Sequence, residues 1–488
     1  MICGGWGSAE MVQRIAAGLL GLALLLGLGA NITTARQHIT FKYTIDYAEG
    51  PLVGQVATLA AGGNIYRPPT ASRPPYTISN YTPLYLLALA RLHPSTGPAW
   101  WPGRLLSWLA TLASSVAIGL ITYTATRQRW AALAAGLLWL GVPYAAYWGS
   151  LYKTDPTALA LSLWGLAVLI RWPRLWWLSG LLWVLAVFAR QSYGLVGPLA
   201  GLVLLWQRSG PRHAIRLAGL MAGAGAALLL GWQVATGGGF WFNVVTANAN
   251  KWHGATGANF WAELATLLPL LLAIGLVGLL RGPGWLRVWL LAALVPSVLI
   301  WKIGSNTNYF LELVAGLVLA SGWLLGQARG RWAVGLPLLL AAQVVYWLPW
   351  WVAQVADLPA RAVVAQVATE LISTTPGQVL ADQHMGAITT AGRPIYYQPF
   401  ISTQLAEQGL WDLSPMATEL ARGQFGLVLV ASEPGPEAQT DIIDQRWPPA
   451  LLAALGAYKR EVIIEQNHKL YIYRPAVPGG LWPEINTK

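Results

Sequence analysis

Residues 15–34, IAAGLLGLALLLGLGANITT, form an apolar run of 20 residues that carries no charge. A helix of this length spans the hydrocarbon core of a bilayer, which is about 30 Å thick. Arg14 precedes the run, so the positive-inside rule predicts a cytoplasmic N-terminus. A cleaved signal peptide is the alternative, since Ala30 to Ala35 supplies small residues, but the many apolar runs that follow favour a membrane anchor.

The composition of the whole chain also indicates a membrane protein. Of its 488 residues, 55% are hydrophobic and only 10% are charged, and the mean hydropathy is +0.48. The 28 tryptophans are typical of the aromatic belts at membrane interfaces. The single cysteine, Cys3, excludes an internal disulfide framework and a cysteine-based zinc site. The net charge of +12 does not indicate nucleic-acid binding, because the basic residues lie in short clusters between apolar runs.

Further apolar runs follow the first, and they bring the predicted number of membrane spans to eleven. These runs begin near Gly103, Trp130, Pro156, Leu175, Ser192, Leu217, Trp261, Leu286, Asn308 and Trp332. Alternate connections carry arginines, namely Arg127 and Arg129; Arg171 and Arg174; Arg208, Arg212 and Arg216; Arg281 and Arg287; Arg329 and Arg331. We therefore predict that these five connections are cytoplasmic and that the others, with the tail from Trp351, are extracytoplasmic.

The distribution of charge divides the chain into two predicted domains. Residues 1–350 carry 22 basic and 6 acidic residues, a net +16, whereas residues 351–488 carry 9 basic and 13 acidic residues, a net −4. We predict a transmembrane catalytic domain over 1–350, with residues 31–102 as its first extracytoplasmic loop. In residues 351–488, short apolar strands alternate with helical patterns, which predicts a separate α/β domain. Its predicted strands are 378–381, 394–397, 425–431, 460–466 and 469–474, the last two joined at Asn467 and His468.

Two acids stand near the start of the first loop, in TIDYAEGPLVGQVATLAAGGNIYRPP (44–69). Gly50 and Pro51 suit the beginning of an amphipathic helix over about 51–61, which we expect to lie on the membrane with Gln55 facing water. Asp46 and Glu49 then sit at its N-terminus, where the helix dipole favours ionised carboxylates. Such a carboxylate can act as a base or bind a cation, or it can be a hydrated loop acid without a role.

Asp155, in SLYKTDPTALAL, is a third candidate acid at the outer end of a predicted span. Acids at an apolar boundary are costly and often functional. The alternative is structural, because Asp before Pro156 is a good helix cap.

Three cations at outer span ends could hold a phosphate by charge-assisted hydrogen bonds, or could anchor lipid headgroups: Lys153, Arg190 and Lys302. Amides at the same level add donors and acceptors, or form ordinary polar loops: Asn248, Asn250, Asn306 and Asn308.

In its order of motifs the chain resembles the GT-C superfamily of membrane glycosyltransferases. Within that superfamily it resembles the protein O-mannosyltransferase and aminoarabinose-transferase group. The matching features, all on one predicted side, are Asp46 with Glu49, GGNIYR (62–67), YTPLY (81–85), Lys153 with Asp155, ARQS (189–192) and SNTNYFLE (305–312). The family usually has its two loop acids adjacent, whereas Tyr47 and Ala48 separate them here, so Glu49 matches less well than Asp46.

The resemblance implies an α-helical polytopic plasma-membrane protein of GT-C type, with about eleven spans and a C-terminal extracytoplasmic α/β domain. It also implies a glycosyltransferase whose donor is a sugar on a polyprenyl phosphate and whose acceptor is an unknown lipid, glycan or protein. Asp46 would be the base and Asp155 would orient the acceptor or the base, with Glu49 as a further catalytic candidate. The substrate-binding set would be Tyr81, Lys153, Arg190, Gln191, Asn248, Asn250, Lys302, Asn306, Asn308 and Tyr309. A divalent cation, Mg²⁺ or Mn²⁺, stays open.

Two other functional classes have many spans. A transporter usually shows inverted repeats and ionisable groups at mid-membrane depth, and neither is evident in the sequence. A non-catalytic scaffold with an extracytoplasmic binding domain would tolerate replacement of Asp46.

Overall fold

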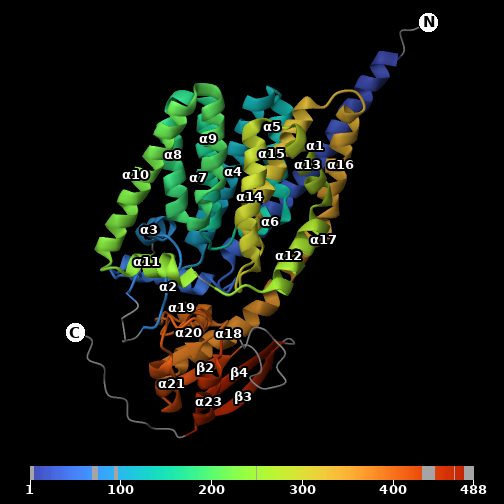
Figure 1. Cartoon of the computed structure of the whole chain (residues 1–488). Coiled ribbons are helices and arrows are strands. Elements are labelled where there is room, and N and C mark those ends of the chain that lie inside the picture. The colour runs from blue at the N-terminus through green and yellow to red at the C-terminus, as the bar shows by residue number, and fades with distance from the viewer. Residues whose placement is uncertain are drawn as a thin grey trace.

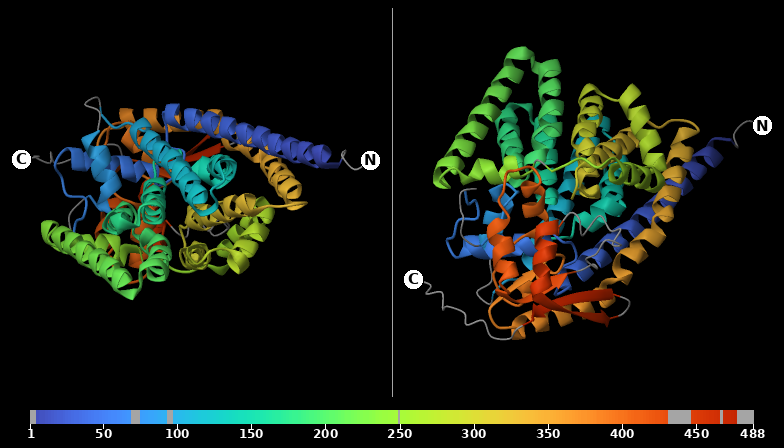
Figure 2. Two further views of the ribbon diagram at one scale, coloured as in Figure 1. Left: turned by 90° about the horizontal axis from the view of Figure 1, so that it is seen from above. Right: turned by 60° about the horizontal axis from the view of Figure 1, so that its bottom comes forward.

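The computed structural model describes residues 5–68, 75–92, 97–248, 250–430, 446–465 and 468–476. A layer of long helices makes up most of the molecule, and a smaller part with a β-sheet lies at one end of it (Figure 1). Seen from above, the long helices pack side by side in more than one row (Figure 2). Their shared core contains mainly Leu, Ala and Trp side chains.

Several of the described helices are long and apolar enough to cross a membrane, and the chain is an integral membrane protein. Six segments qualify individually: Glu10–Thr40, Trp101–Thr126, Pro211–Ala235, Gly284–Trp301, Thr307–Gln327 and Trp332–Thr374. A seventh is broken by a 91° bend, between α12 (Gly254–Leu267) and α13 (Pro269–Arg281). Only 11% of the most apolar window of α10 (Pro211–Ala235) is buried in the protein, as expected for a helix that faces lipid.

The remaining predicted spans coincide with shorter helices. These are α5 (Arg129–Gly141), α7 (Asp155–Arg171), α8 (Trp176–Ala189) and α9 (Val196–Ser209). They have 13 to 17 residues, below the roughly 20 that a straight span needs. The number eleven therefore stays a prediction, and six or seven spans meet the criteria of length and apolarity. The other long helices are α1 (Gly5–Thr40), α4 (Trp101–Thr126), α14 (Gly284–Val298), α15 (Leu311–Gln327) and α16 (Trp332–Tyr346).

Short helices of the connecting loops lie in the part of the helix layer that is nearer the sheet (Figure 1). They are α2 (Glu49–Ala60), α3 (Pro83–Arg91), α6 (Pro143–Trp148), α11 (Gly239–Val244) and α17 (Leu348–Ala356). The helix predicted over 51–61 is thus present as α2, but its predicted position on the membrane surface was wrong. Leu52, Val53 and Val56 are buried in a cluster with Tyr85 of α3, because α3 covers the apolar face of α2.

The predicted water-facing side of α2 also needs correction at Gln55. This side chain is buried and donates to the carbonyl of Ile78, and it accepts from the hydroxyl of Ser79. The first loop therefore folds back on α2 and satisfies its polar face within the protein.

In the residues that the structure describes, the C-terminal part contains one sheet of four strands in the order β1-β2-β4-β3. β1 (Gln378–Ala381) pairs in parallel with β2 (Phe425–Val430), and β4 (His468–Pro475) pairs antiparallel with both β2 and β3 (Tyr458–Glu465). Successive side chains of β2 enter different apolar clusters, so both faces of the sheet are covered. The accompanying helices are α18 (Leu358–Thr374), α19 (Met385–Thr390), α20 (Pro399–Ala406), α21 (Ser414–Ala421) and α23 (Pro449–Ala454).

Most of the predicted strands in this part were found, with one exception. Residues 394–397 do not form a strand; Tyr397 makes a single bridge, with Tyr76 of the first loop. Pro394 lacks an N–H and Pro399 begins a helix, which leaves too few residues for a ladder. The predicted turn residue Asn467 lies outside the described residues, as does Cys3. The domain boundary at residue 350 stays a prediction, since the apolar helical run continues to Thr374.

Candidate functional site

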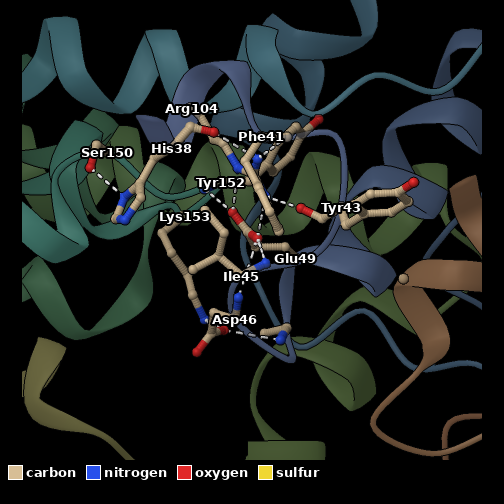
Figure 3. A network of polar contacts seen from close by, with 12 residues as sticks. His38, Phe41, Tyr43, Ile45, Asp46, Glu49, Arg104, Ser150, Tyr152 and Lys153 are labelled. Carbon is tan, nitrogen blue, oxygen red and sulfur yellow. Dashed lines mark hydrogen bonds and ion pairs between the residues drawn. The ribbon is translucent and has the colours of Figure 1, made fainter. Parts of the chain in front are cut away.

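The predicted site residues of the first loop lie where α1 ends and α2 begins, against the N-terminus of α4 and the loop before α7 (Figure 3). Two acids from this segment meet two different cations. Glu49 pairs with Arg104, and Asp46 pairs with Lys153. The two pairs differ in burial, and this difference separates their possible roles.

The carboxylate of Glu49 is fully buried and fully paired. Its oxygens accept from Nε of Arg104 at 3.0 Å and from Nη2 at 2.8 Å. They also accept backbone N–H groups of Ile45 and Tyr152, both at 2.8 Å. Burial alone would raise the pKa of Glu49, but the positive charge of Arg104 and these hydrogen bonds lower it to about 2. Glu49 therefore stays ionised, and solvent or substrate has no access to it.

Arg104 joins this carboxylate to the end of α1. Its Nη1 donates to the carbonyls of His38 and Phe41, and its Nη2 donates to that of Tyr43, at 2.6 to 2.8 Å. Sequence analysis missed Arg104 as a functional residue. The sequence did carry a signal, because Arg104 is a single charge inside the apolar stretch WPGRLLSW. A charged side chain within a membrane segment is costly and is almost always paired with another polar group.

Asp46 forms the second ion pair, with Lys153, and its side chain keeps 16% exposure. The same carboxylate accepts the backbone N–H of Ala48 at 3.0 Å. Nζ of Lys153 also lies 5.4 Å from the ring centre of Trp148. Burial alone would lower the pKa of Lys153, but the carboxylate of Asp46 raises it well above its usual value. Of the two loop acids, Asp46 is therefore the one whose carboxylate is partly exposed.

Asp155 lies at the start of α7 in a second buried cluster. Oδ2 accepts from Nη1 of Arg190 at 2.8 Å, and Oδ1 accepts from the amide of Asn308 at 3.0 Å. Its carboxylate makes no capping bond to the helix, so the capping alternative is not what the structure shows. The guanidinium of Arg190 lies over the rings of Tyr81 and Tyr309, at 5.2 and 5.1 Å.

The other predicted amides hold loops together. Gln191 and Asn248 both donate to the carbonyl of Asn80, at 2.8 and 3.0 Å. Asn250 donates to the carbonyl of Ile303, and the side chain of Asn306 accepts the N–H of Thr307. These hydrogen bonds connect the loops that surround the ion pairs of Asp46 and Asp155.

Lys302 differs from the other two predicted cations, because it forms no ion pair with any acid in the described part of the chain. Its Nζ donates to the carbonyl of Asn248. Burial lowers its pKa, with no opposing carboxylate. It is therefore the predicted cation whose charge is least compensated.

A cavity of about 340 Å³, called here the helix-side cavity, lies beside the loop that carries Asp46 and Glu49. Its walls are mainly aromatic or polar side chains: Tyr144, Tyr147, Trp148, Glu263, Asn306, Thr307, Trp350, Gln354, Asp357 and Arg361. Trp148 donates to the hydroxyl of Thr307 at 2.9 Å, and its ring also lies near Nζ of Lys153. Trp148 therefore connects the cavity with the ion pair of Lys153 and Asp46.

A divalent cation does not fit the residues as they are arranged. Lys153 and Arg190 already neutralise the carboxylates of Asp46 and Asp155. Among the described residues, no group of three or more His, Cys, Asp or Glu side chains is placed to hold a metal. We derive no step through a metal.

Comparison with known proteins matches the fold to solved structures. A scan of family models and a search of curated proteins each find no match. ArnT of Cupriavidus metallidurans bound to undecaprenyl phosphate is similar to 94% of this chain and 99% of its own, with a TM-score of 0.61 and 15% identity. The apo form of ArnT gives a TM-score of 0.60. The oligosaccharyltransferase of Archaeoglobus fulgidus is similar to 94% of this chain and 74% of its own, with a TM-score of 0.51 and 11% identity.

These two proteins are GT-C membrane glycosyltransferases, and this chain has their fold over most of its length. The resemblance predicted from Asp46, Asp155 and their neighbours is therefore confirmed at the level of fold.

Proposed function

We propose that this protein is a membrane glycosyltransferase that moves a sugar from a polyprenyl-phosphate donor to an acceptor at the extracytoplasmic face of the membrane. The observation that supports this most is Asp46. It is a partly exposed carboxylate in a loop at the end of a membrane helix, and a cation, an aromatic cavity and a second acid cluster lie close to it. The binding of undecaprenyl phosphate by ArnT, a protein of the same fold, supports the choice of donor.

In the proposed reaction Asp46 is the general base. An acceptor hydroxyl attacks the anomeric carbon of the donor sugar, and Asp46 takes the hydroxyl proton. The bond from that carbon to the phosphate oxygen breaks, and its electron pair leaves with the polyprenyl phosphate. A departing phosphate needs positive charge in a partly desolvated place, which Lys153, Arg190 and Lys302 supply. One displacement inverts the anomeric centre.

The helix-side cavity is the proposed place of the donor sugar. Aromatic rings of Tyr147, Trp148 and Trp350 offer flat faces to a sugar ring, and Glu263 offers a hydrogen-bond acceptor. The lipid chain would leave this cavity between helices of the membrane layer. Asn306 and Thr307 would then lie at the phosphate end.

For Glu49 we propose a structural role in place of the catalytic one that the sequence suggested. Its carboxylate holds Arg104 and the backbone of Ile45 in place, directly before Asp46. We propose that Asp155 orients the guanidinium of Arg190 through their hydrogen bond. The rings of Tyr81 and Tyr309 would hold the same guanidinium by cation–π contacts.

The test uses the full chain reconstituted in liposomes. Undecaprenyl phosphate serves as the binding probe, detected by native mass spectrometry, and a panel of undecaprenyl-phosphate-linked neutral sugars serves as donors. We expect binding of the probe and consumption of at least one donor, and loss of donor consumption in Asp46→Asn. A chain that neither binds the probe nor consumes a donor would contradict the proposal and favour a transporter or scaffold.

A further inference from the structure

A second cavity, of about 310 Å³, lies next to the helix-side cavity; we call it the sheet-side cavity. It shares three lining residues with the helix-side cavity: Ile45, Asp357 and Arg361. Nη1 of Arg361 donates to the carbonyl of Ile45 at 3.0 Å, and its Nε pairs with Asp357 at 2.6 Å. Ile45, which directly precedes Asp46, therefore forms a common wall of the two cavities together with the pair of Asp357 and Arg361.

The two cavities have different walls. The helix-side cavity is formed largely by residues of α6, α12 and α17, which lie in the helix layer. The sheet-side cavity is formed by the loop before α2 and by residues of the C-terminal part. Its polar lining consists of Tyr43, Thr44, Tyr47, Gln383, His384 and Thr390 together with the Asp357 and Arg361 pair. Its wall is therefore shared between the first loop and the C-terminal part.

The charge of the sheet-side cavity defines the ligand it suits. Among the described residues that line it, Asp357 and Arg361 are the only Asp, Glu, Lys or Arg, and they neutralise each other. The hydroxyl and amide groups of the remaining lining can both donate and accept hydrogen bonds. A neutral molecule rich in hydroxyl groups matches this lining, whereas an anionic or cationic headgroup would find no opposite charge free to meet it.

The wall of this cavity is tightly joined to the acid-bearing loop. A Cβ added to Gly50 of α2 would lie 2.7 Å from the backbone N of Gly386 in α19, so the two backbones are in direct contact. The hydroxyl of Thr389 donates to the carbonyl of Gly50 at 3.2 Å. Tyr47 packs edge-on against Phe400 of α20. The C-terminal part therefore sets the position of the loop as well as forming the cavity.

We infer that the sheet-side cavity is the acceptor site and that the acceptor is a neutral, hydroxyl-bearing carbohydrate. The inference rests on the proposed function, in which an acceptor oxygen attacks one face of the anomeric carbon while phosphate leaves from the other. Donor and acceptor then need two neighbouring spaces close to the base, and two cavities that share Ile45, the residue before Asp46, suit this arrangement. The C-terminal part thereby takes part in acceptor selection.

The test fills the cavity without touching the donor side. Ala365 of α18 lines the sheet-side cavity, and its neighbour Gln366 is exposed and does not. We compare Ala365→Trp with Gln366→Trp, using the full chain and a donor from the panel that it consumes. Three quantities are measured: binding of undecaprenyl phosphate, release of free sugar to water, and transfer to an added oligosaccharide.

For Ala365→Trp we expect transfer to the oligosaccharide to fall at least tenfold, with probe binding and sugar release within twofold of the parent. Gln366→Trp should match the parent in all three. If Ala365→Trp does not purify as a folded protein, Gln383→Ala replaces it, and a severalfold rise in the KM for the oligosaccharide with unchanged probe binding is expected.

Three results would overturn the inference. Unchanged transfer in the variants would show that the acceptor binds elsewhere. Loss of probe binding in Ala365→Trp would assign the cavity to the donor. Efficient transfer to hydroxyl groups of a polypeptide, with none to the oligosaccharide, would contradict the acceptor class. A parent chain that consumes no donor would instead contradict the proposed function itself.

Discussion

Replacing Glu49 by Gln should destabilise the protein strongly, because the change leaves the charge of Arg104 buried without a counter-charge. Both side chains of this pair are fully buried. Breaking a buried ion pair by removing one partner costs about 3–5 kcal/mol, mostly from the uncompensated charge. In addition, the amide of Gln would point donor groups at the N–H groups of Ile45 or Tyr152, or at the guanidinium of Arg104.

The same pair gives a dependence of stability on pH. The folded-state pKa of Glu49 is lowered to about 2 from its usual 4.5, so the unfolded state binds the proton more readily. The contribution of Glu49 to stability is therefore fully present above pH 4.5 and is lost as the pH falls toward 2. The parent should lose stability across this window more steeply than Glu49→Gln does.

The assay is thermal unfolding of the purified chain in detergent, with Glu461→Gln, at the exposed pair of Glu461 and Arg474, as the matched control. We expect Glu49→Gln to unfold well below the parent and Glu461→Gln to unfold close to it. The double variant Glu49→Gln with Arg104→Met should recover much of the loss, because it removes both charges. A Glu49→Gln protein that is as stable as the parent but inactive would refute this reasoning and return Glu49 to the catalytic role.

Four further outcomes are expected. Asp46→Asn should lower the transfer rate about 100-fold or more and leave undecaprenyl phosphate binding unchanged, as measured in the reconstituted assay. Arg190→Lys should weaken probe binding severalfold, since an ammonium cannot replace a planar group between two aromatic rings; equal binding would exclude Arg190 from the phosphate site. Lys302→Met should also weaken probe binding. In the parent, that binding should decline at alkaline pH as Lys302, whose pKa burial lowers, loses its proton. A cysteine at the exposed Ser373, with Cys3 replaced, should react with an impermeant thiol reagent from outside intact cells, and reaction only after lysis would overturn the proposed orientation.

The membrane character and much of the C-terminal sheet could be predicted because they depend on local patterns. The run 15–34 lies inside α1, and the predicted strand 378–381 matches β1. The orientation of α2 could not be predicted in the same way. Its apolar face suits a membrane surface and a protein interior equally, and the decision depends on α3, which packs against it from a later part of the loop.

The spans are harder to define for a related reason. Apolarity marked α5, α7, α8 and α9, but their lengths depend on where other helices cover their ends. α7, for example, is almost entirely buried between other helices. A buried helix needs no lipid-facing length, so hydropathy alone cannot distinguish it from a complete span.

The sequence indicated Asp46 and Glu49 as candidate site residues but could not separate their roles. Three positions apart at one helix start, both acids meet the same helix dipole and have similar intrinsic chemistry. They are distinguished by residues far along the chain, Arg104 for Glu49 and Lys153 for Asp46. A carboxylate whose lone pairs are all taken by a buried guanidinium and backbone N–H groups has no capacity left to accept a proton from a substrate, whereas one with a single ammonium partner and some exposure keeps it. The catalytic assignment therefore follows from long-range packing, and spacing within the loop carries no information about it.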